Sequence, residues 1–167
     1  YPDDVYDGRA YVYVESAPGT WTLEQTIDPE LYSDYRQFGA SMDFEGDVLA
    51  IGGLYLRPEA GATESGSVYI YELDPIDGWV VQDHLVHVDP DYNEWFGRSL
   101  ELEGDRLLVG ASRRDLPGLS QAGAAFLLER DAGGNWQQLF EWNADDPVSS
   151  ASYGRAVALD GEHILVA

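Results

Sequence analysis

Short segments of alternating or uninterrupted apolar residues recur along the chain and are separated by turn residues. Ser99–Glu103 alternates leucine with polar residues, which is the two-residue period of a β-strand with one buried face. After a Gly-Asp turn, Arg106–Val109 is almost wholly apolar, as expected for a strand buried on both faces. Ala124–Arg130 and a segment beginning at Trp136 complete a set of four strands. Because no apolar pattern with a sustained 3.6-residue period is present, we predict an all-β protein.

The same landmarks recur along the chain at steps of 58 and then 57 residues. They are Phe38-Gly39, Phe96-Gly97 and Tyr153-Gly154, the tryptophans Trp21, Trp79 and Trp136, and the glycines Gly8, Gly66 and Gly123. A repeat of this length fits a four-stranded β-propeller blade better than a helical repeat. We therefore predict four-stranded antiparallel sheets in tandem, about three blades' worth, as a partial blade at 1–27, blades at 38–85 and 96–142, and a partial blade at 153–167. We expect either a longer array or a chain that pairs with another copy, since propellers close with about four to eight blades.

The repeated aromatic residues have a structural interpretation. A large ring at Phe38, Phe96 or Tyr153 can fill the space between neighbouring sheets, while the glycine that follows lets two backbones approach. Trp21, Trp79 and Trp136 are expected to pack in the same way at the outer hairpins. The alternative is an aromatic platform for a ligand.

Several segments resemble FG-GAP repeats, in particular their bacterial form. They are FGASMDFEGDVLAIGG, FGRSLELEGDRLLVGA, the degenerate copy YGRAVALDGEHILVA, and the downstream GSVYIYE and GAAFLLE, each followed by Trp. Gly-Gly and Gly-Ala-Ser stand where Gly-Ala-Pro is typical. Related repeats build the propeller of integrin α-subunits and occur in bacterial surface and secreted proteins. The resemblance implies a secreted or cell-surface adhesion or protein-interaction module, and not an enzyme.

The resemblance raises the question of whether the chain binds calcium. Integrin-like copies carry Asp-x-Asp-x-Asp-Gly between the first two strands, whereas Glu45-Gly46-Asp47 and its equivalents are too short to wrap a cation that takes six to eight oxygens. Asp89–Glu94 also places oxygen ligands at alternate positions, but it lacks the glycine and the glutamate of an EF-hand loop. We therefore predict no cofactor and read Asp89–Glu94 as an acidic turn, with a calcium loop as the alternative.

Charge excludes several classes of partner. The 167 residues include 31 Asp and Glu against 9 cations, all of them Arg, so the net charge is −22. Such a surface repels phosphate backbones and anionic lipids, so we predict no nucleic-acid partner and no peripheral membrane binding. Because no apolar run approaches the roughly 20 residues of a spanning helix, we also predict no membrane insertion. The absence of Cys excludes disulfides and thiol chemistry. The acidity fits either a halophilic protein or one with diffuse cation binding.

Long connections follow the second and fourth strands of each repeat, and antiparallel order puts both on one edge. We predict that a protein or glycan partner binds this edge, since Tyr, Trp and Arg are the residues most enriched at binding hot spots. The candidate residues are Tyr55, Arg57, Arg113 and Arg114 in the loops after the second strand, and Tyr35, Tyr92 and Trp95 in the loops after the fourth. The alternative is that these loops only cover the blade edges and pack on each other.

No nucleophile elbow, P-loop or zinc-protease motif is present, and chance pairs of carboxylates are too common here to indicate a glycosidase. Asp43 and Glu101, at equivalent positions of the first strand, line either a polar channel or a solvated strand face. We predict a non-catalytic interaction module. The alternatives are an accessory domain of a secreted polysaccharide-acting enzyme and, less in keeping with the missing motifs, an enzyme in its own right.

Overall fold

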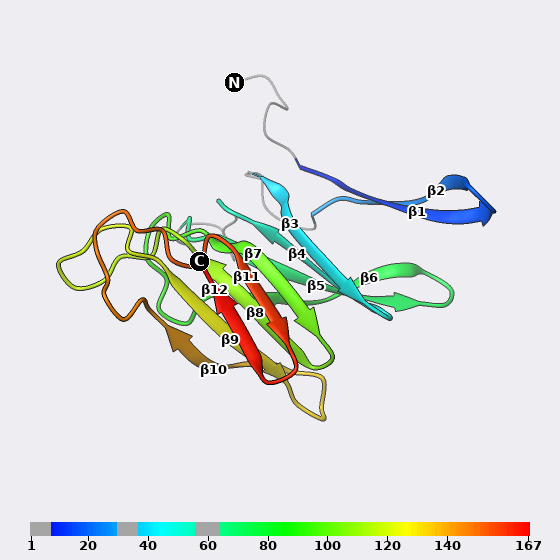
Figure 1. Ribbon diagram of the computed structural model, residues 1–167. Helices are drawn as coiled ribbons and strands as arrows, with labels where there is room; N and C mark the ends of the chain where they lie inside the picture. The colour runs from blue at the N-terminus through cyan, green and yellow to red at the C-terminus, as the bar shows by residue number, and fades with distance from the viewer. Residues whose placement is uncertain (1–7, 30–36, 56–63) are drawn as a thin grey trace, which may run out of the picture.

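The computed structural model describes residues 8–29, 37–55 and 64–167, which form twelve β-strands and no helix (Figure 1). One four-stranded sheet contains β3 (Phe38–Glu45), β4 (Val48–Gly53), β5 (Ser67–Asp74) and β6 (Gly78–Leu85). A second contains β7 (Phe96–Glu103), β8 (Arg106–Ala111), β9 (Ala124–Arg130) and β10 (Trp136–Trp142). Two hairpins flank them, β1 (Ala10–Ala17) with β2 (Thr20–Ile27), and β11 (Val157–Asp160) with β12 (His163–Val166).

The predicted all-β class and the four-stranded antiparallel sheets are confirmed. Neighbouring strands pair antiparallel in chain order within both full sheets. The first strands β3, β7 and β11 contact one another in series, so the repeats stand side by side (Figure 1). The described sheets form an open row rather than a closed ring.

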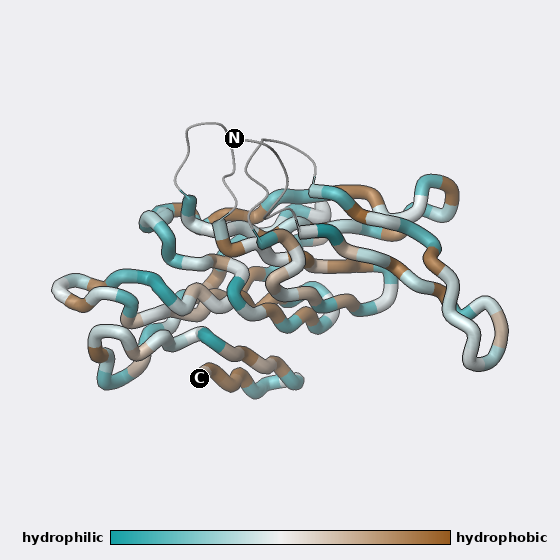
Figure 2. Tube along the Cα trace, turned by 90° about the horizontal axis from the view of Figure 1, so that it is seen from above, coloured by the Kyte–Doolittle hydropathy of each residue, from teal (hydrophilic) through white to brown (hydrophobic). Residues whose placement is uncertain are grey.

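Apolar side chains gather between the two full sheets. Phe96 and Phe126 meet there with their ring centroids 5.4 Å apart, together with Leu107 and Ile70. Phe38 packs at the preceding junction, against Tyr69. Figure 2 shows the alternation of apolar and polar residues along the strands that produces these layers. Phe38 and Phe96 are therefore buried at these junctions, as the packing interpretation expects, and Tyr153 is half-buried at the third junction.

The Phe-Gly landmark is a turn at the start of the first strand. The amide of Arg98 donates to the carbonyl oxygen of Trp95 at 3.0 Å, and the same bond recurs at the other two copies. Gly97 has a φ of +90°, the positive value that this position of a type II turn requires. Phe38 and Phe96 pair with the second strand before the turn, and pairing resumes after a register shift at Ser41 and Ser99. β3 and β7 therefore begin at Phe38 and Phe96, three residues before the starts at Ser41 and Ser99 that the alternation predicts.

One expectation needs correction, and one open alternative can be narrowed. Trp79 and Trp136 pack half-buried against the core, but Trp21 is 63% exposed, because its hairpin β1–β2 pairs with no further strand in the described part of the chain. Asp43 is not simply solvated on its strand face, since its carboxylate accepts a hydrogen bond from the Leu102 amide at 2.6 Å. Burial raises the pKa of Glu101, and the charges of Asp43 and Glu103 add to this effect.

Candidate binding surface at the loop edge

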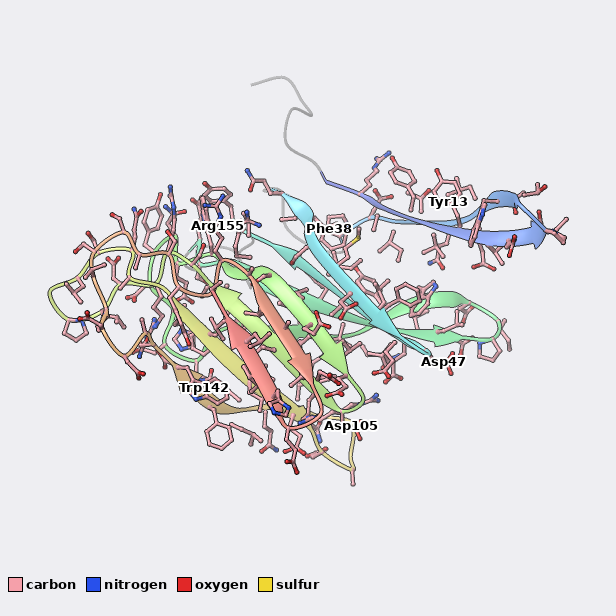
Figure 3. The ribbon with its side chains drawn as sticks, in the orientation of Figure 1. Tyr13, Phe38, Asp47, Asp105, Trp142 and Arg155 are labelled. Atoms are coloured by element: carbon pink, nitrogen blue, oxygen red, sulfur yellow. The ribbon has the colours of Figure 1, made fainter. Side chains whose placement is uncertain are left out.

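Short turns and long connections lie at opposite edges of the sheets. Figure 3 shows Asp47 and Asp105 at the tips of the short turns and Arg155 at the other edge. At that second edge the two sets of long loops are joined by backbone hydrogen bonds. Asn93 donates to Glu64 at 2.7 Å, Arg113 to Glu94 at 2.9 Å, and Ser152 to Gln121 at 3.2 Å. The long loops therefore lie at one edge and form one connected layer, which we call the loop edge. Contact between the loops is also what the alternative interpretation, loops that only cover the blade edges, predicts.

Trp95 is held in the middle of the loop edge. The Cζ of Arg113 lies 3.9 Å from the Trp95 ring centroid, within the range of a cation–π contact. Tyr55 meets the same ring edge-on, with centroids 5.9 Å apart, and the indole N–H donates to Asn93 Oδ1 at 2.8 Å. Both Trp95 and Arg113 remain partly exposed, and Tyr92 is exposed. An aromatic and a guanidinium are thus fixed where a partner can reach them.

The backbone at Trp95 is unusual for a bulky residue, with a φ of +62°. Gln37 and Ser152, the equivalent residues of the other copies, have φ of +65° and +60°. The conformation therefore belongs to the turn of the repeat, while the indole ring is particular to this copy.

Arg114 has a different environment from its neighbour Arg113. Its Nη1 donates to Glu94 at 2.9 Å, to Asp91 at 3.0 Å and to the Asp89 carbonyl oxygen at 3.1 Å, and its Nε lies 3.3 Å from Glu141. The oxygens of Asp89, Asp91 and Glu94, which lie in the segment considered above as a calcium loop, therefore accept hydrogen bonds from the Arg114 guanidinium. The Glu94 side chain is fully buried and that of Arg114 is 13% exposed. The Arg114 guanidinium is thus engaged by Asp91, Glu94 and Glu141 and is not free to contact a partner.

The two histidines near this loop lie in separate environments. His87 is buried beside Phe126, with Nδ1 3.3 Å from Glu94 Oε1. His84, on β6, stacks on Tyr69 at 4.1 Å and lies 2.8 Å from Ser67 Oγ. Burial lowers the pKa of His84 to about 4, and nearby Asp83 opposes that shift. In the described residues no three side chains of metal-binding type gather at one point.

Residues 79–128 match the family model of the FG-GAP repeat, from the start of β6 to within β9. This segment is similar to an FG-GAP repeat. A comparison with curated proteins found no match. The matched FG-GAP repeat includes the Phe96-Gly97 turn, Trp95, Arg113 and the buried pair Glu94 and Arg114.

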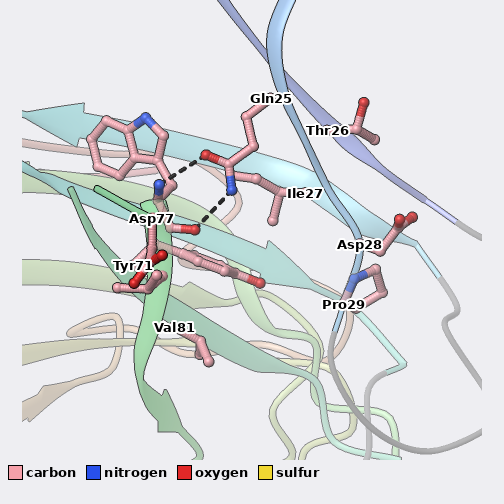
Figure 4. A pocket seen from close by; sticks show the side chains of 10 residues that line it. Gln25, Thr26, Ile27, Asp28, Pro29, Tyr71, Asp77 and Val81 are labelled. Atoms are coloured by element: carbon pink, nitrogen blue, oxygen red, sulfur yellow. Dashed lines mark hydrogen bonds between the residues drawn. The ribbon is translucent and has the colours of Figure 1, made fainter. Parts of the chain in front are cut away.

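A hollow of about 450 Å³ lies between β2 and the strands β5 and β6, and Trp79, Val80 and Val81 of the matched segment line part of it (Figure 4). Gln25 projects from β2 and brackets the Trp79 backbone, accepting from its N–H at 2.8 Å and donating to its carbonyl oxygen at 2.9 Å. This side chain therefore joins the hairpin β1–β2 to the neighbouring sheet.

Tyr35 and Arg57, the remaining candidates, lie outside the described residues. Sequence reasoning missed the Glu94–Arg114 pair, because nothing in the local pattern distinguishes a buried glutamate in an acidic turn from its solvated neighbours. The part of the chain that the structure describes contains no helix long and apolar enough to cross a membrane.

Proposed function

We propose that the chain is an extracellular interaction module that binds a protein or glycan partner through the loop edge. FG-GAP repeats are typically extracellular and non-catalytic, which supports binding without turnover. The observation that carries the proposal is the joining of the long loops into one hydrogen-bonded layer around Trp95 and Arg113. A surface that is already ordered loses little conformational entropy when a partner binds.

The opposite edge offers a partner much less. Its connections are the tight turns at Gly46-Asp47, Gly104-Asp105 and Gly161-Glu162, which expose mainly acidic side chains. Charged acidic residues are depleted in the buried centres of interfaces, whereas Trp, Tyr and Arg are enriched there. The contrast between the two edges therefore provides a matched control within the same chain.

The experiment begins with arrays of glycans and of extracellular proteins, probed with the labelled chain. A loop-edge variant (Tyr55→Ala, Trp95→Ala, Arg113→Ala) is then compared with a turn variant (Asp47→Ala, Asp105→Ala, Glu162→Ala), and circular dichroism checks that both are folded. We expect the loop-edge variant to bind its partner at least about tenfold more weakly, and the turn variant to stay within about twofold, since hot-spot truncations exceed about 1 kcal/mol. Equal losses from both variants, or a loss from the turn variant alone, would contradict the proposal.

A further inference from the structure

The arginines of this acidic protein fall into two groups. Seven of the nine lie in the described part of the chain, and four of these pair with carboxylates: Arg9 with Asp28, Arg106 with Glu103, Arg130 with Glu72, and Arg114 with three acids. Arg98, Arg113 and Arg155 form no ion pair with any described residue. All three line the same hollow, of about 260 Å³, at the loop edge.

The hollow is formed where two copies of the repeat meet. Arg98 and Arg155 occupy equivalent positions, each directly after the Phe-Gly or Tyr-Gly turn. Their backbones are fixed by hydrogen bonds from Arg98 N to Trp95 O at 3.0 Å and from Arg155 N to Ser152 O at 3.1 Å. The first copy has Ala40 at this position, so the paired arginines are particular to this junction.

Arg113 joins them from the loop after β8, where its guanidinium rests on the face of Trp95. Ser112, which is buried, and Gln121 supply polar groups to the lining. The nearest acid along this loop, Asp115, accepts a hydrogen bond from the Gln121 amide at 2.7 Å and forms no ion pair with the three arginines. The described residues that line the hollow therefore present cations without carboxylate counter-charges.

Three like charges around one hollow repel each other, and a bound anion would relieve that repulsion. The arrangement is notable in a chain with 31 acids and only 9 cations, where most described arginines do find a carboxylate. The planar fork of a guanidinium matches the oxygens of carboxylate, sulfate and phosphate groups, which it binds through two parallel hydrogen bonds.

We propose that this hollow binds a compact oxyanion group, a carboxylate, sulfate or phosphate, carried by the partner of the loop edge. The inference rests on the proposed function and gives the chemistry of one contact within it. The volume is slightly below that of typical small-molecule pockets, so it fits one charged group and a few attached atoms. The net charge of the chain, −22, repels polyanions, so the ligand carries its anionic group on an otherwise uncharged framework.

The test uses sodium sulfate, sodium phosphate and sodium glucuronate as probes, with sodium chloride at the same ionic strength as the reference. Isothermal calorimetry and amide chemical shifts are followed for three proteins. They are the unmodified chain, the pocket variant (Arg98→Gln, Arg113→Gln, Arg155→Gln), and a control with the same charge change (Arg9→Gln, Arg106→Gln, Arg130→Gln). We expect saturable one-to-one binding of at least one oxyanion by the unmodified chain and the control, and at least tenfold weaker binding by the pocket variant.

Comparison of the three probes shows which kind of oxyanion the hollow binds. Glucuronate presents a planar carboxylate, whereas sulfate and phosphate are tetrahedral. Should the pocket variant fail to fold, the single change Arg155→Gln, at an exposed side chain, replaces it with an expected loss of about threefold or more. The absence of saturable binding by every probe, or equal binding by the pocket and control variants, would overturn the inference.

Failure of this inference can be told apart from failure of the proposed function. A partner that is lost on Trp95→Ala but retained by the pocket variant leaves the loop edge as the binding surface and removes the oxyanion contact. Saturable oxyanion binding at the hollow, together with a partner insensitive to the loop-edge variant, supports the hollow and contradicts the proposed function.

Discussion

The hydroxyl group of Ser41 donates a hydrogen bond to the backbone carbonyl of Gly97, with 2.6 Å between the two oxygens. The residues lie 56 positions apart, on the first strands of neighbouring sheets. Ser99 repeats the contact with Gly154 at 2.9 Å. Serine and glycine thus form a joint between repeats, beside the aromatic ring that fills the junction.

Removal of one such hydroxyl tests the joint. Ser99→Ala should lower the free energy of unfolding by about 1 kcal/mol, because the bond to Gly154 is lost while the carbonyl remains partly buried. Urea denaturation followed by tryptophan fluorescence measures the change. Ser149→Ala, at an exposed serine, is the control and should change stability by less than about 0.5 kcal/mol. Indistinguishable variants would show that the serine contact adds nothing to the joint.

The glycine facing the same joint should tolerate no side chain. A Cβ on Gly110 would lie 1.9 Å from the Gly154 carbonyl oxygen and 2.4 Å from Ser99 Oγ. Gly110→Ala should therefore destabilise the protein by about 3 kcal/mol or more, since the two backbones must separate. Gly104→Ala, where nothing lies within 4 Å and φ is +57°, should lose only about 1 kcal/mol from backbone strain. Thermal denaturation of the two variants compares them, and similar melting temperatures would contradict this account of the joint.

Much of this architecture is encoded locally and could be predicted. Strand alternation, Gly turns and the recurring landmarks located all twelve strands, because each signal depends on neighbouring residues. The alternating pattern predicts starts of β3 and β7 that are three residues too late. It cannot reveal the true starts, because the turn at Phe96-Gly97 interrupts the strand pairing with a register shift.

The candidate site was less accessible to sequence reasoning. The loops were correctly placed at one edge, because antiparallel connectivity requires it. The different environments of Arg113 and Arg114 were not predictable, since they depend on a second loop from another part of the chain. Glu94, two positions before Phe96, is buried with one carboxylate oxygen on the Arg114 guanidinium and the other 3.3 Å from His87 Nδ1.

The Glu94–Arg114 pair gives a prediction about stability. Arg114→Met should destabilise the protein by about 3–5 kcal/mol, because it leaves the carboxylate of Glu94 buried without its partner. The double variant Arg114→Met, Glu94→Gln should recover part of the loss, since the buried charge is then gone. Arg155→Met, at an exposed arginine without a described ion pair, is the control and should stay within about 0.5 kcal/mol. Guanidinium denaturation measures the free energies of unfolding. A loss in the double variant equal to the sum of the two single-variant losses would contradict this account of the pair.

His84 should make stability depend on pH in a defined window. Its pKa is lowered by burial from 6.5 to about 4, so between these values the unfolded state binds more protons than the folded state. Stability should therefore fall as pH decreases from about 6.5 to about 4, by an amount on the order of 3 kcal/mol, and this contribution should level off below that. The difference in unfolding free energy between the unmodified chain and His84→Gln isolates this effect from the carboxylates. A difference that does not vary with pH would contradict the assignment.

Salt should stabilise this chain through its charge. At −22 the folded state suffers self-repulsion, which ions screen over a Debye length of about 8 Å at physiological ionic strength. We expect the melting temperature to rise between 10 mM and 1 M NaCl, and to rise less steeply in a variant with Asp47→Asn, Asp105→Asn and Glu162→Gln. Calcium chloride at matched ionic strength should act as a screening salt, because Asp91 and Glu94 already bind Arg114. A melting temperature independent of NaCl would contradict the role of self-repulsion, and a stoichiometric micromolar calcium isotherm would instead restore the loop at Asp89–Glu94 as a metal site.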